Sequence, residues 1–320
     1  MRLVVTGAAG FIGSSLSDAL LAAGHDVVGI DAFIDYYARE VKEANLAKAR
    51  EHESFAFHEA DLRSAALEPL VDGADAVLHL AAMPGLVRSW SEVELYTTCN
   101  LLATHRLIEA ALTCGVPRFV HASTSSVYGL LAVGDETAPT RPISPYGVTK
   151  LAAEQLIQAF VATRGLNASI LRYFSIYGPR QRPDMAYHLF AEAMLDGRPI
   201  TVTGDGRQTR SNTFVDDCVV ATIAAIEGAA SGEVYNIAGG EEISLNDAIA
   251  AIGEALETTP RIEYAPARPG DQLRTSADTS RATAAFGFRP ATRVRDGLAA
   301  QVAWHVERRR RRPRRAAAAT

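Results

Sequence analysis

Short apolar runs alternate with amphipathic stretches through the first 175 residues. The apolar runs occupy residues 2–7, 26–31, 54–61, 75–82, 118–123 and 168–174. Runs of this length, apolar at almost every position, are typical of strands buried on both faces of a parallel sheet. Stretches with helical spacing lie between them, at 12–23, 100–114 and 145–164. The alternation predicts an α/β fold built on a doubly wound parallel sheet.

The pattern becomes irregular after residue 175. Loops rich in Gly, Pro and Arg interleave there with helical patterns near 185–197, 216–228, 244–257 and 293–307. This change predicts a smaller α/β lobe assembled from several segments. We assign the main domain to 1–174 with return segments near 211–240, the smaller lobe to 175–210 and 241–305, and a disordered Arg/Ala-rich tail to 306–320.

Composition narrows the class of protein. With 48% hydrophobic and 22% charged residues the chain can bury a sizeable core. The sequence contains no run of about 18 apolar residues, so we expect no membrane-spanning helix. Its three cysteines, Cys99, Cys114 and Cys218, are too few and too scattered for a disulfide framework or a zinc cage, so we expect no metal. The first residues indicate a strand and a glycine turn instead of a signal peptide, and we expect a cytoplasmic protein.

The net charge of −5 hides an asymmetry between the body and the tail. Residues 308–315 hold seven arginines, and without them 25 basic residues face 37 acidic ones, a balance of −12. A body with this acidic excess is not expected to have the basic surface that binds nucleic acid. An arginine run can touch nucleic acid or an acidic membrane, but we interpret this one as a solvated tail with neither partner.

A glycine-rich turn follows the first apolar run. Gly7 and Gly10 allow the backbone to turn tightly and approach a pyrophosphate, and Gly13 lets the next helix pack close to the sheet. The helix N-terminus then offers N–H groups and a partial positive charge to phosphates. Asp31 ends the second apolar run, where a carboxylate would accept the ribose hydroxyls and repel a 2′-phosphate. The turn therefore predicts a dinucleotide site that prefers NAD over NADP.

Three further polar residues lie at or near predicted strands. Asp61 follows the third run, where it could reach the adenine amino group or cap a helix, and both interpretations stay open. His79 and His121 each lie within an apolar strand, and we interpret both as satisfied core histidines without a catalytic role.

A tyrosine and a lysine lie four residues apart on one predicted helix. Ser144 is its expected N-cap and Pro145 its first residue, so Tyr146 and Lys150 share a face. A nearby cation favours the phenolate and brings the tyrosine pKa from about 10 toward neutrality. The hydroxyl cluster at 123–126 follows a strand and could hydrogen-bond a substrate oxygen. Together these residues indicate proton-transfer chemistry beside the dinucleotide.

Five motifs resemble the extended short-chain dehydrogenases/reductases, specifically the nucleotide-sugar epimerases and dehydratases. They are TGAAGFIG, HLAA (79–82), STSSVYG (123–129), SPYGVTK (144–150) and RYFSIYGPRQRPDM (172–185). The resemblance covers about residues 1–305. It implies a Rossmann domain with bound, recycled NAD, a UDP- or dTDP-sugar across the smaller lobe, and a homodimer formed through helices 100–114 and 145–164.

The resemblance also implies roles for individual residues. Tyr146 would be the base, Lys150 would hold the NAD ribose and tune Tyr146, and Thr124 would hydrogen-bond the sugar 4-oxygen. The implied cofactor-binding residues are Gly7, Gly10, Phe11, Ile12, Gly13, Asp31, Asp61, Leu62, Ala81, Lys150 and Tyr173. The implied substrate-binding residues are Arg88, Ser125, Ser126, Ser175, Arg182, Arg210, Arg268 and Asp271.

Departures from the family pattern bear on the reaction. Thr124 is followed by Ser125 and Ser126, where 4,6-dehydratases carry Asp-Glu and UDP-glucuronate decarboxylases usually carry Ser-Glu. Without these carboxylates, hydride abstraction and return at C4 remain. Ser175 and Arg182 resemble the UDP-glucuronate 4-epimerases, in which a hydroxyl and an arginine grip the C5 carboxylate. A guanidinium suits a carboxylate because its planar fork donates two parallel hydrogen bonds.

The sequence therefore predicts 4-epimerisation of UDP-glucuronate, with three alternatives. The same ketone could lose CO₂, or the substrate could be a neutral UDP-sugar. The chain could also be a non-catalytic NAD-binding regulator, although the presence of both Tyr146 and Lys150 argues against this. Residues 210–213 read Arg-Ser-Asn-Thr where relatives usually have Arg-Asp-aromatic-Thr, which leaves the support of Arg210 and the identity of the sugar in question.

Overall fold

The computed structural model describes residues 1–267 and 272–311. Its main sheet has seven parallel strands in the order β12-β7-β5-β4-β1-β2-β3. They are β1 (Arg2–Thr6), β2 (Asp26–Asp31), β3 (Phe55–Glu59), β4 (Ala76–His79), β5 (Phe119–Thr124), β7 (Ala168–Tyr173) and β12 (Val234–Ile237). The strand order reverses direction at β1, so the predicted doubly wound Rossmann sheet is confirmed.

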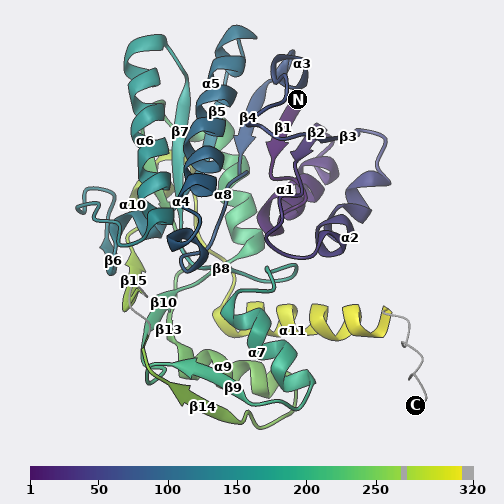
Figure 1. Ribbon diagram of the computed structural model, residues 1–320, viewed down its shortest axis with the longest axis vertical. Helices are drawn as coiled ribbons and strands as arrows, with labels where there is room; N and C mark the ends of the chain where they lie inside the picture. Colours follow the sequence, from purple (N-terminus) through teal and green to yellow (C-terminus); the bar gives the residue numbers. More distant parts are fainter. Residues whose placement is uncertain (268–271, 312–320) are drawn as a thin grey trace.

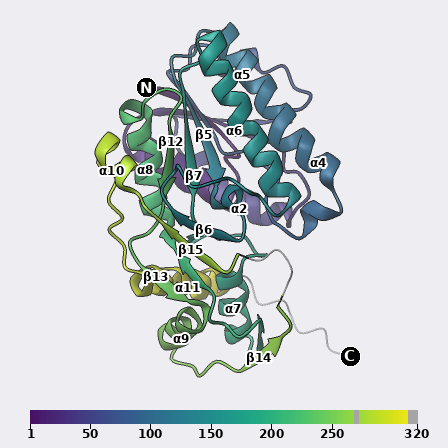
Figure 2. The same ribbon diagram turned by 90° about the vertical axis from the view of Figure 1, so that its left-hand side faces the viewer.

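Helices cover both faces of this sheet, as the two perpendicular views show (Figures 1 and 2). One face packs against α3 (Glu68–Val71), α5 (Ala103–Thr113) and α6 (Pro145–Arg164), and α4 (Val93–Thr97) precedes α5 on the same side. The other face packs against α1 (Phe11–Ala22), α2 (Arg39–Arg50), α8 (Val215–Gly228) and α10 (Ser280–Phe286). Leu3 and Val5 of β1 point into the second layer and Val4 into the first, as alternation along a strand requires.

The smaller lobe lies beyond the carboxyl ends of the strands, in the lower half of Figure 1. It contains α7 (Ala186–Leu195), α9 (Leu245–Ala255) and α11 (Val294–Arg311). Its short strands are β8 (Ile176–Tyr177), β9 (Ile200–Thr203), β10 (Thr209–Ser211), β11 (Thr213–Phe214), β13 (Glu242–Ser244) and β14 (Ile262–Ala265). In a separate four-stranded sheet, β10 and β13 join β6 (Leu131–Gly134) and β15 (Arg274–Ala277). That sheet links the main domain to the smaller lobe, because β6 belongs to the chain before residue 175.

Three details differ from the sequence-based prediction. Helix α10, within the segment 241–305 assigned to the smaller lobe, packs against the main sheet beside β12 and α8. Strand β3 lies at the edge of the sheet and is largely exposed, although a strand buried on both faces was expected at 54–61. Residues 306–311, expected to begin a disordered tail, continue helix α11. There Arg309 pairs with Glu192 of α7 at 2.5 Å and with Asp196, the residue after α7, at 2.7 Å, and these partners give this arginine a folded position.

Candidate active site

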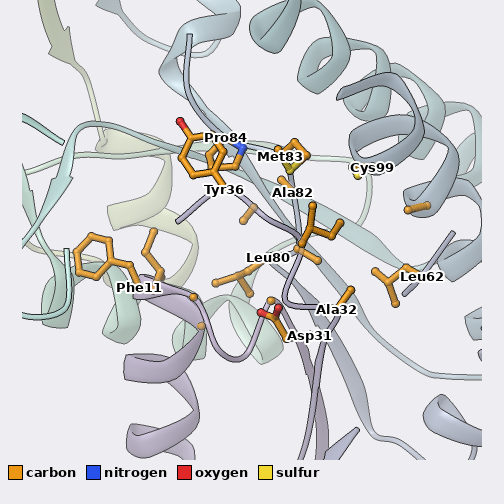
Figure 3. A pocket seen from close by; sticks show the side chains of 18 of the residues that line it. Phe11, Asp31, Ala32, Tyr36, Leu62, Leu80, Ala82, Met83, Pro84 and Cys99 are labelled. Carbon is orange, nitrogen blue, oxygen red and sulfur yellow. The ribbon is translucent and has the colours of Figure 1, made fainter. Parts of the chain in front are cut away.

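One cavity lies at the carboxyl ends of β1, β2, β4, β5 and β7, where ligands bind in open α/β sheets. Figure 3 shows Phe11, Asp31 and Ala32 on one part of its wall and Leu80, Ala82, Met83 and Pro84, from the segment after β4, on another. All the predicted cofactor-binding residues line it: Gly7, Gly10, Phe11, Ile12, Gly13, Asp31, Asp61, Leu62, Ala81, Lys150 and Tyr173. Tyr146 and Arg182 line the same cavity. The structure thus brings the cofactor set together with the proposed base and the proposed carboxylate ligand.

The glycine turn is built for close approach. Gly7 has a φ of +72°, and a Cβ there would lie 2.9 Å from the Ala81 nitrogen. A Cβ at Gly13 would lie 2.1 Å from the Gly7 oxygen. Helix α1 begins at Phe11 without an acidic residue in its first turn and without a side-chain cap among the described residues. Its N-terminal N–H groups are therefore available to a pyrophosphate, which fits the dinucleotide site.

Asp31 lies at the tip of β2 against the glycine turn. Its Oδ2 accepts a hydrogen bond from the Ala9 backbone N–H at 3.2 Å, and its Oδ1 accepts one from Phe33 at 2.8 Å. Burial raises the pKa of Asp31, while the Lys42 ammonium and the two N–H donors oppose that rise. The carboxylate keeps acceptor capacity for ribose hydroxyls, and its charge disfavours a 2′-phosphate.

Asp61 lines the cavity, which leaves the adenine interpretation as a prediction. The helix-cap interpretation is wrong, because a turn and no helix follows Asp61; its Oδ1 accepts the backbone N–H of Arg63 at 2.9 Å within that turn. Its ion pair with the Arg63 guanidinium, at 2.7 Å, holds the pKa of Asp61 below the ordinary value. Leu62 beside it has its carbonyl held by Arg106 at 2.6 Å.

Helix α6 presents Tyr146 and Lys150 to the cavity. The Ser144 side chain caps the helix by accepting the Gly147 N–H at 3.1 Å, as predicted. Burial raises the pKa of Tyr146, and a hydrogen bond with Thr124 and the charge of Arg182 oppose that rise. Burial also lowers the pKa of Lys150 to about 8. Arg182 is thus a cation that favours the phenolate of Tyr146, a role for which the sequence indicated Lys150.

The hydroxyl loop follows β5. Thr124 is its first residue, and its Oγ1 accepts the backbone N–H of Ser126 at 3.1 Å. Thr124 and Ser125 are buried. Gln272 Nε2 donates to the Ser125 carbonyl at 3.2 Å, which ties this loop to the segment before β15. Among the hydroxyls of this loop, Thr124 is the one whose hydrogen bonding lowers the pKa of Tyr146.

Arg182 is engaged by a neighbouring carboxylate. Its Nε lies 3.0 Å from Asp184 Oδ1 and its Nη2 lies 3.1 Å from Asp184 Oδ2. Tyr36, from the loop after β2, donates its hydroxyl to Asp184 Oδ2 at 3.0 Å, and the Arg182 guanidinium lies 5.6 Å from the Tyr36 ring centre. Ser175, at the start of this connection, has a φ of +43°, a conformation that only a few per cent of non-glycine residues adopt.

Of the predicted substrate-binding residues that the structure describes, Arg182 alone lines the cavity. Ser125, Ser126 and Ser175 lie outside the lining, as does the predicted catalytic Thr124, and so do Arg88 and Arg210, which make polar contacts elsewhere. Arg88 pairs with Glu92 at 2.7 Å, donates to the Asp35 carbonyl at 2.7 Å, and lies over the Tyr36 ring. Arg210 on β10 donates to the carbonyls of Thr209 and Gln272.

The altered segment after Arg210 is buried. Ser211 Oγ donates to the Gly239 carbonyl at 2.7 Å and Asn212 Nδ2 donates to the Arg210 carbonyl at 3.2 Å, so these residues support the arginine locally. The last two predicted residues, Arg268 and Asp271, lie outside the described residues.

Several wall residues escaped the sequence analysis. Met83 and Cys99 line the cavity, and buried Asn100 holds the backbone of Met83 through bonds of 2.7 and 3.1 Å. Nothing in their spacing marks them, although a buried asparagine in a helical stretch is a signal of a specific hydrogen-bonding task. His79 is a satisfied core histidine, bonded to two threonine hydroxyls. For His121 that interpretation is incomplete, because its ring contacts Lys150 at 3.1 Å.

One group of side chains in residues 1–267 and 272–311 has the composition of a metal site. His188, Glu192 and His305 place ligand atoms within 4.8 Å of one another. Both oxygens of Glu192 are already paired with cations, with Arg308 at 2.6 Å and with Arg309 at 2.5 Å. Two guanidinium charges disfavour a metal ion there, so we interpret the group as an ion-pair cluster joining α7 to α11.

A glycine turn opening onto a parallel sheet, beside a helix that carries Tyr146 and Lys150, defines a Rossmann-fold enzyme of the extended short-chain dehydrogenase/reductase type. The chain belongs to the NAD dependent epimerase/dehydratase family, whose model matches residues 3–238. The predicted family, fold, enzyme class and NAD cofactor are thereby confirmed. No helix within the described part of the chain is long and apolar enough to cross a membrane.

Relatives of the chain carry different sugar names. An uncharacterised UDP-glucose epimerase of Bacillus subtilis is 39% identical over 309 residues, which are 95% of this chain and 98% of the relative. The UDP-glucuronic acid 4-epimerase of Bacillus cereus, solved with UDP-glucuronic acid and NAD, has a TM-score of 0.93 at 39% identity and covers 96% of this chain and 99% of its own. A dTDP-glucose 4,6-dehydratase of Streptomyces venezuelae, solved with NAD, reaches 0.91 at 33% identity, covering 97% and 98%. Overall similarity therefore does not identify the sugar on which this chain acts.

Proposed function

We propose that this enzyme interconverts UDP-glucuronate and UDP-galacturonate by epimerisation at C4. The observation that carries the proposal is the position of Arg182, which lines the same cavity as Tyr146 and acts electrostatically on its hydroxyl. A guanidinium beside the catalytic tyrosine suits a sugar with a carboxylate one carbon from the reacting C4. The proposal is also supported by the hydroxyl loop, in which Ser125 and Ser126 replace the carboxylates that elimination or decarboxylation would use.

NAD fits the residues present. The backbone space at Gly7 and Gly13 would admit its pyrophosphate, Asp31 would accept its adenosine ribose hydroxyls, and Lys150 would hold its other ribose. When bound, NAD supplies the acceptor and donor of hydride at C4.

Tyr146 is the proton carrier in this proposal. Its phenolate takes the proton of the sugar 4-hydroxyl as C4 is oxidised, and its hydroxyl returns that proton after the ketone has turned over in the cavity. Thr124 lowers the pKa of Tyr146 by hydrogen bonding, and it would also donate a hydrogen bond to the 4-oxygen of the sugar. Lys150 contributes positive charge at the same end of the cavity. Because Arg182 also favours the phenolate, one guanidinium would assist proton transfer as well as substrate binding.

Arg182 and Ser175 would determine the fate of the ketone. A 4-keto glucuronate is a β-keto acid, and it loses CO₂ readily when the bond to the carboxylate stands perpendicular to the ketone. A guanidinium that pins the carboxylate near the carbonyl plane slows this loss. Retention of CO₂ therefore follows from the same contact that selects the acidic sugar.

We also propose a homodimer formed through the layer of α4, α5 and α6. Among the described residues, Trp90, Val93, Leu102 and Val148 are exposed apolar side chains on or next to these helices. A second copy covering them would remove an apolar patch from water. We further propose a cytoplasmic location, because the three cysteines are too few and too scattered in the sequence for a disulfide framework.

A neutral UDP-sugar is the second candidate substrate. In the structure Arg182 is paired with Asp184, so its charge is already balanced when no substrate carboxylate is present. A neutral sugar would leave this pair intact. The relative from Bacillus subtilis named as a UDP-glucose epimerase is consistent with that candidate.

Proton NMR of the purified enzyme with UDP-glucuronate and NAD tests the proposal. We expect UDP-galacturonate to accumulate to an equilibrium mixture with all six sugar carbons retained. A UDP-pentose or its 4-keto form would show decarboxylation and refute the role given to Arg182. No change with UDP-glucuronate, together with turnover of UDP-glucose, would replace the proposal with the neutral-sugar candidate. No change with either, and no absorbance at 340 nm, would indicate a non-catalytic NAD-binding protein.

A further inference from the structure

The Lys150 ammonium is held by two acceptors beneath the cavity. Its Nζ lies 2.7 Å from the carbonyl oxygen of Ala122 and 3.1 Å from Nε2 of His121, both on strand β5. An ammonium has three N–H donors and no acceptor. Two of the donors are therefore directed to β5, and one remains for a partner in the cavity.

This contact fixes the protonation state of His121. Because the ammonium can only donate, Nε2 must carry a lone pair, and the single ring proton must lie on Nδ1. His121 is fully buried, and its Nδ1 has no hydrogen-bond partner among the described residues. The ring therefore accepts a hydrogen bond from Lys150 through Nε2 while its buried Nδ1–H is left without an acceptor in the described part of the chain. Leaving a buried donor unpaired is unfavourable, so a purely structural histidine does not account for this arrangement.

The groups around His121 keep it neutral. The charged or titratable side chains that face it are Lys150 on α6 and His79 on β4, whose ring centre is 5.2 Å away. His79 already uses both nitrogens, on Thr6 at 2.7 Å and Thr104 at 2.8 Å, so it offers His121 no partner. Burial first, and the Lys150 charge second, hold the pKa of His121 well below its ordinary value. These surroundings therefore favour the neutral ring, which can accept a hydrogen bond from Lys150.

We propose that His121 is a positioning residue for Lys150, whose Nε2 holds the ammonium in place and in its charged form. Glu154, one turn further along α6, acts on Lys150 electrostatically in the same direction. The importance of His121 for turnover rests on the proposed function, since only there does Lys150 have a catalytic task. The contact itself is independent of any substrate.

Two amide variants of His121 test whether a hydrogen-bond acceptor must lie at the distance of Nε2, or whether any polar side chain suffices. In His121→Gln the side-chain oxygen lies as many bonds from Cβ as Nε2 of the histidine does, so it can accept a hydrogen bond from Lys150. In His121→Asn the oxygen is one bond shorter and cannot span the same gap. His121→Leu, which fills the space without an acceptor, replaces the Asn variant if that one fails to fold. His188→Asn, a buried histidine on α7 with no contact to Lys150 in the structure, is the control.

The direct readout is the titration of Lys150 in protein stripped of NAD. The chain has three lysines, so ¹³Cε-lysine labelling gives three signals, which Lys42→Arg and Lys48→Arg assign. We expect the Lys150 pKa, about 8 in the unmodified chain, to fall by about one unit in His121→Asn and to stay within about 0.3 units in His121→Gln. An unchanged pKa in the Asn or Leu variant, or equal falls in the Gln and Asn variants, would overturn the proposal.

Turnover gives the second readout. Because Lys150 would lose its charge at lower pH, the alkaline limb of the kcat profile should move down by about one unit in His121→Asn and return in His121→Gln. A uniform loss of kcat at all pH values in both variants would mean a structural role and would overturn the proposal. If no UDP-sugar is turned over at all, the proposed function fails while the NMR titration still decides the question about His121.

Discussion

Replacing Asp184 with Asn should make the enzyme prefer acidic sugars more strongly. Asp184 is the carboxylate that Arg182 holds in the structure, through contacts of 3.0 and 3.1 Å. A substrate carboxylate must share or displace this partner, whereas a neutral sugar need not. Asn keeps the shape of the side chain and can still accept the Tyr36 hydroxyl, so the loop contact survives while the competing charge is removed.

The expected size follows from the exposure of the pair. The Arg182 side chain is 21% exposed and that of Asp184 is 37% exposed, so water screens their attraction. Partly exposed ion pairs of this kind contribute about 1 kcal/mol of interaction free energy at most. If the substrate carboxylate no longer has to displace this interaction, its binding constant should improve by about fivefold at most. We therefore expect KM for UDP-glucuronate to fall by up to about fivefold in Asp184→Asn, with KM for UDP-glucose nearly unchanged.

Steady-state kinetics with both sugars measures the ratio of the two kcat/KM values. Tyr36→Phe is the matched control, because it removes the hydroxyl bond to Asp184 and leaves the ion pair in place. That variant should affect both sugars equally. An equal change for both sugars in Asp184→Asn, or a loss of preference for UDP-glucuronate, would refute the view that Asp184 competes with the substrate carboxylate.

Three further predictions follow from named contacts. Tyr146→Phe should lower kcat by at least about a hundredfold without changing the melting temperature, and substantial residual turnover would remove Tyr146 as the proton carrier. Gly13→Ala should lose most bound NAD in the purified protein, because its Cβ would lie 2.1 Å from the Gly7 oxygen; undiminished NAD content by absorbance would contradict this. Burial alone would raise the pKa of Glu192, but His305 and Arg309 hold it well below its ordinary value, so its stabilising effect is fully present above about pH 4.3 and is lost progressively as the pH falls from there to the pKa in the folded protein. Glu192→Gln should therefore reduce the free energy of unfolding by about 2 kcal/mol at pH 7 and by about 1 kcal/mol less at pH 3.5 in urea titrations, and an equal loss at both pH values would show that charge is not the cause.

The main sheet could be predicted because its strands are buried and uninterrupted. The run at 26–31 and the helix at 145–164 match the structure residue for residue, since burial and capping chemistry mark both clearly. Helix α2 escaped prediction because its exposed face is strongly polar and only a few side chains, such as Leu46, reach the core. The strands of the smaller lobe are two to four residues long, too short for alternation to show.

The site was predictable where local spacing encodes chemistry, as it does in the glycine turn and in the pair Tyr146 and Lys150. Contacts between distant segments could not be predicted from one sequence. Asp184 meets Tyr36 across 148 positions, and His121 meets Lys150 across 29. Each of these side chains looks ordinary in its own segment. Only the folded arrangement shows that Asp184 contacts Arg182 and that His121 contacts Lys150.

The loop after β2 is held beside the cavity by contacts that bear on the release of a bound cofactor. Three side chains from outside the loop fasten it beside the cavity: Lys42 holds the Ile34 carbonyl at 2.9 Å, Arg88 holds the Asp35 carbonyl, and Asp184 holds Tyr36. Ile34 and Tyr36 also line the cavity next to Asp31. We therefore expect a dinucleotide bound in this cavity to leave slowly, because the loop can move aside only when these contacts break. An enzyme that regenerates its oxidant within each cycle gains from such slow exchange, because one captured molecule then serves many substrates, and the cellular ratio of oxidised to reduced nicotinamide has little influence on the rate.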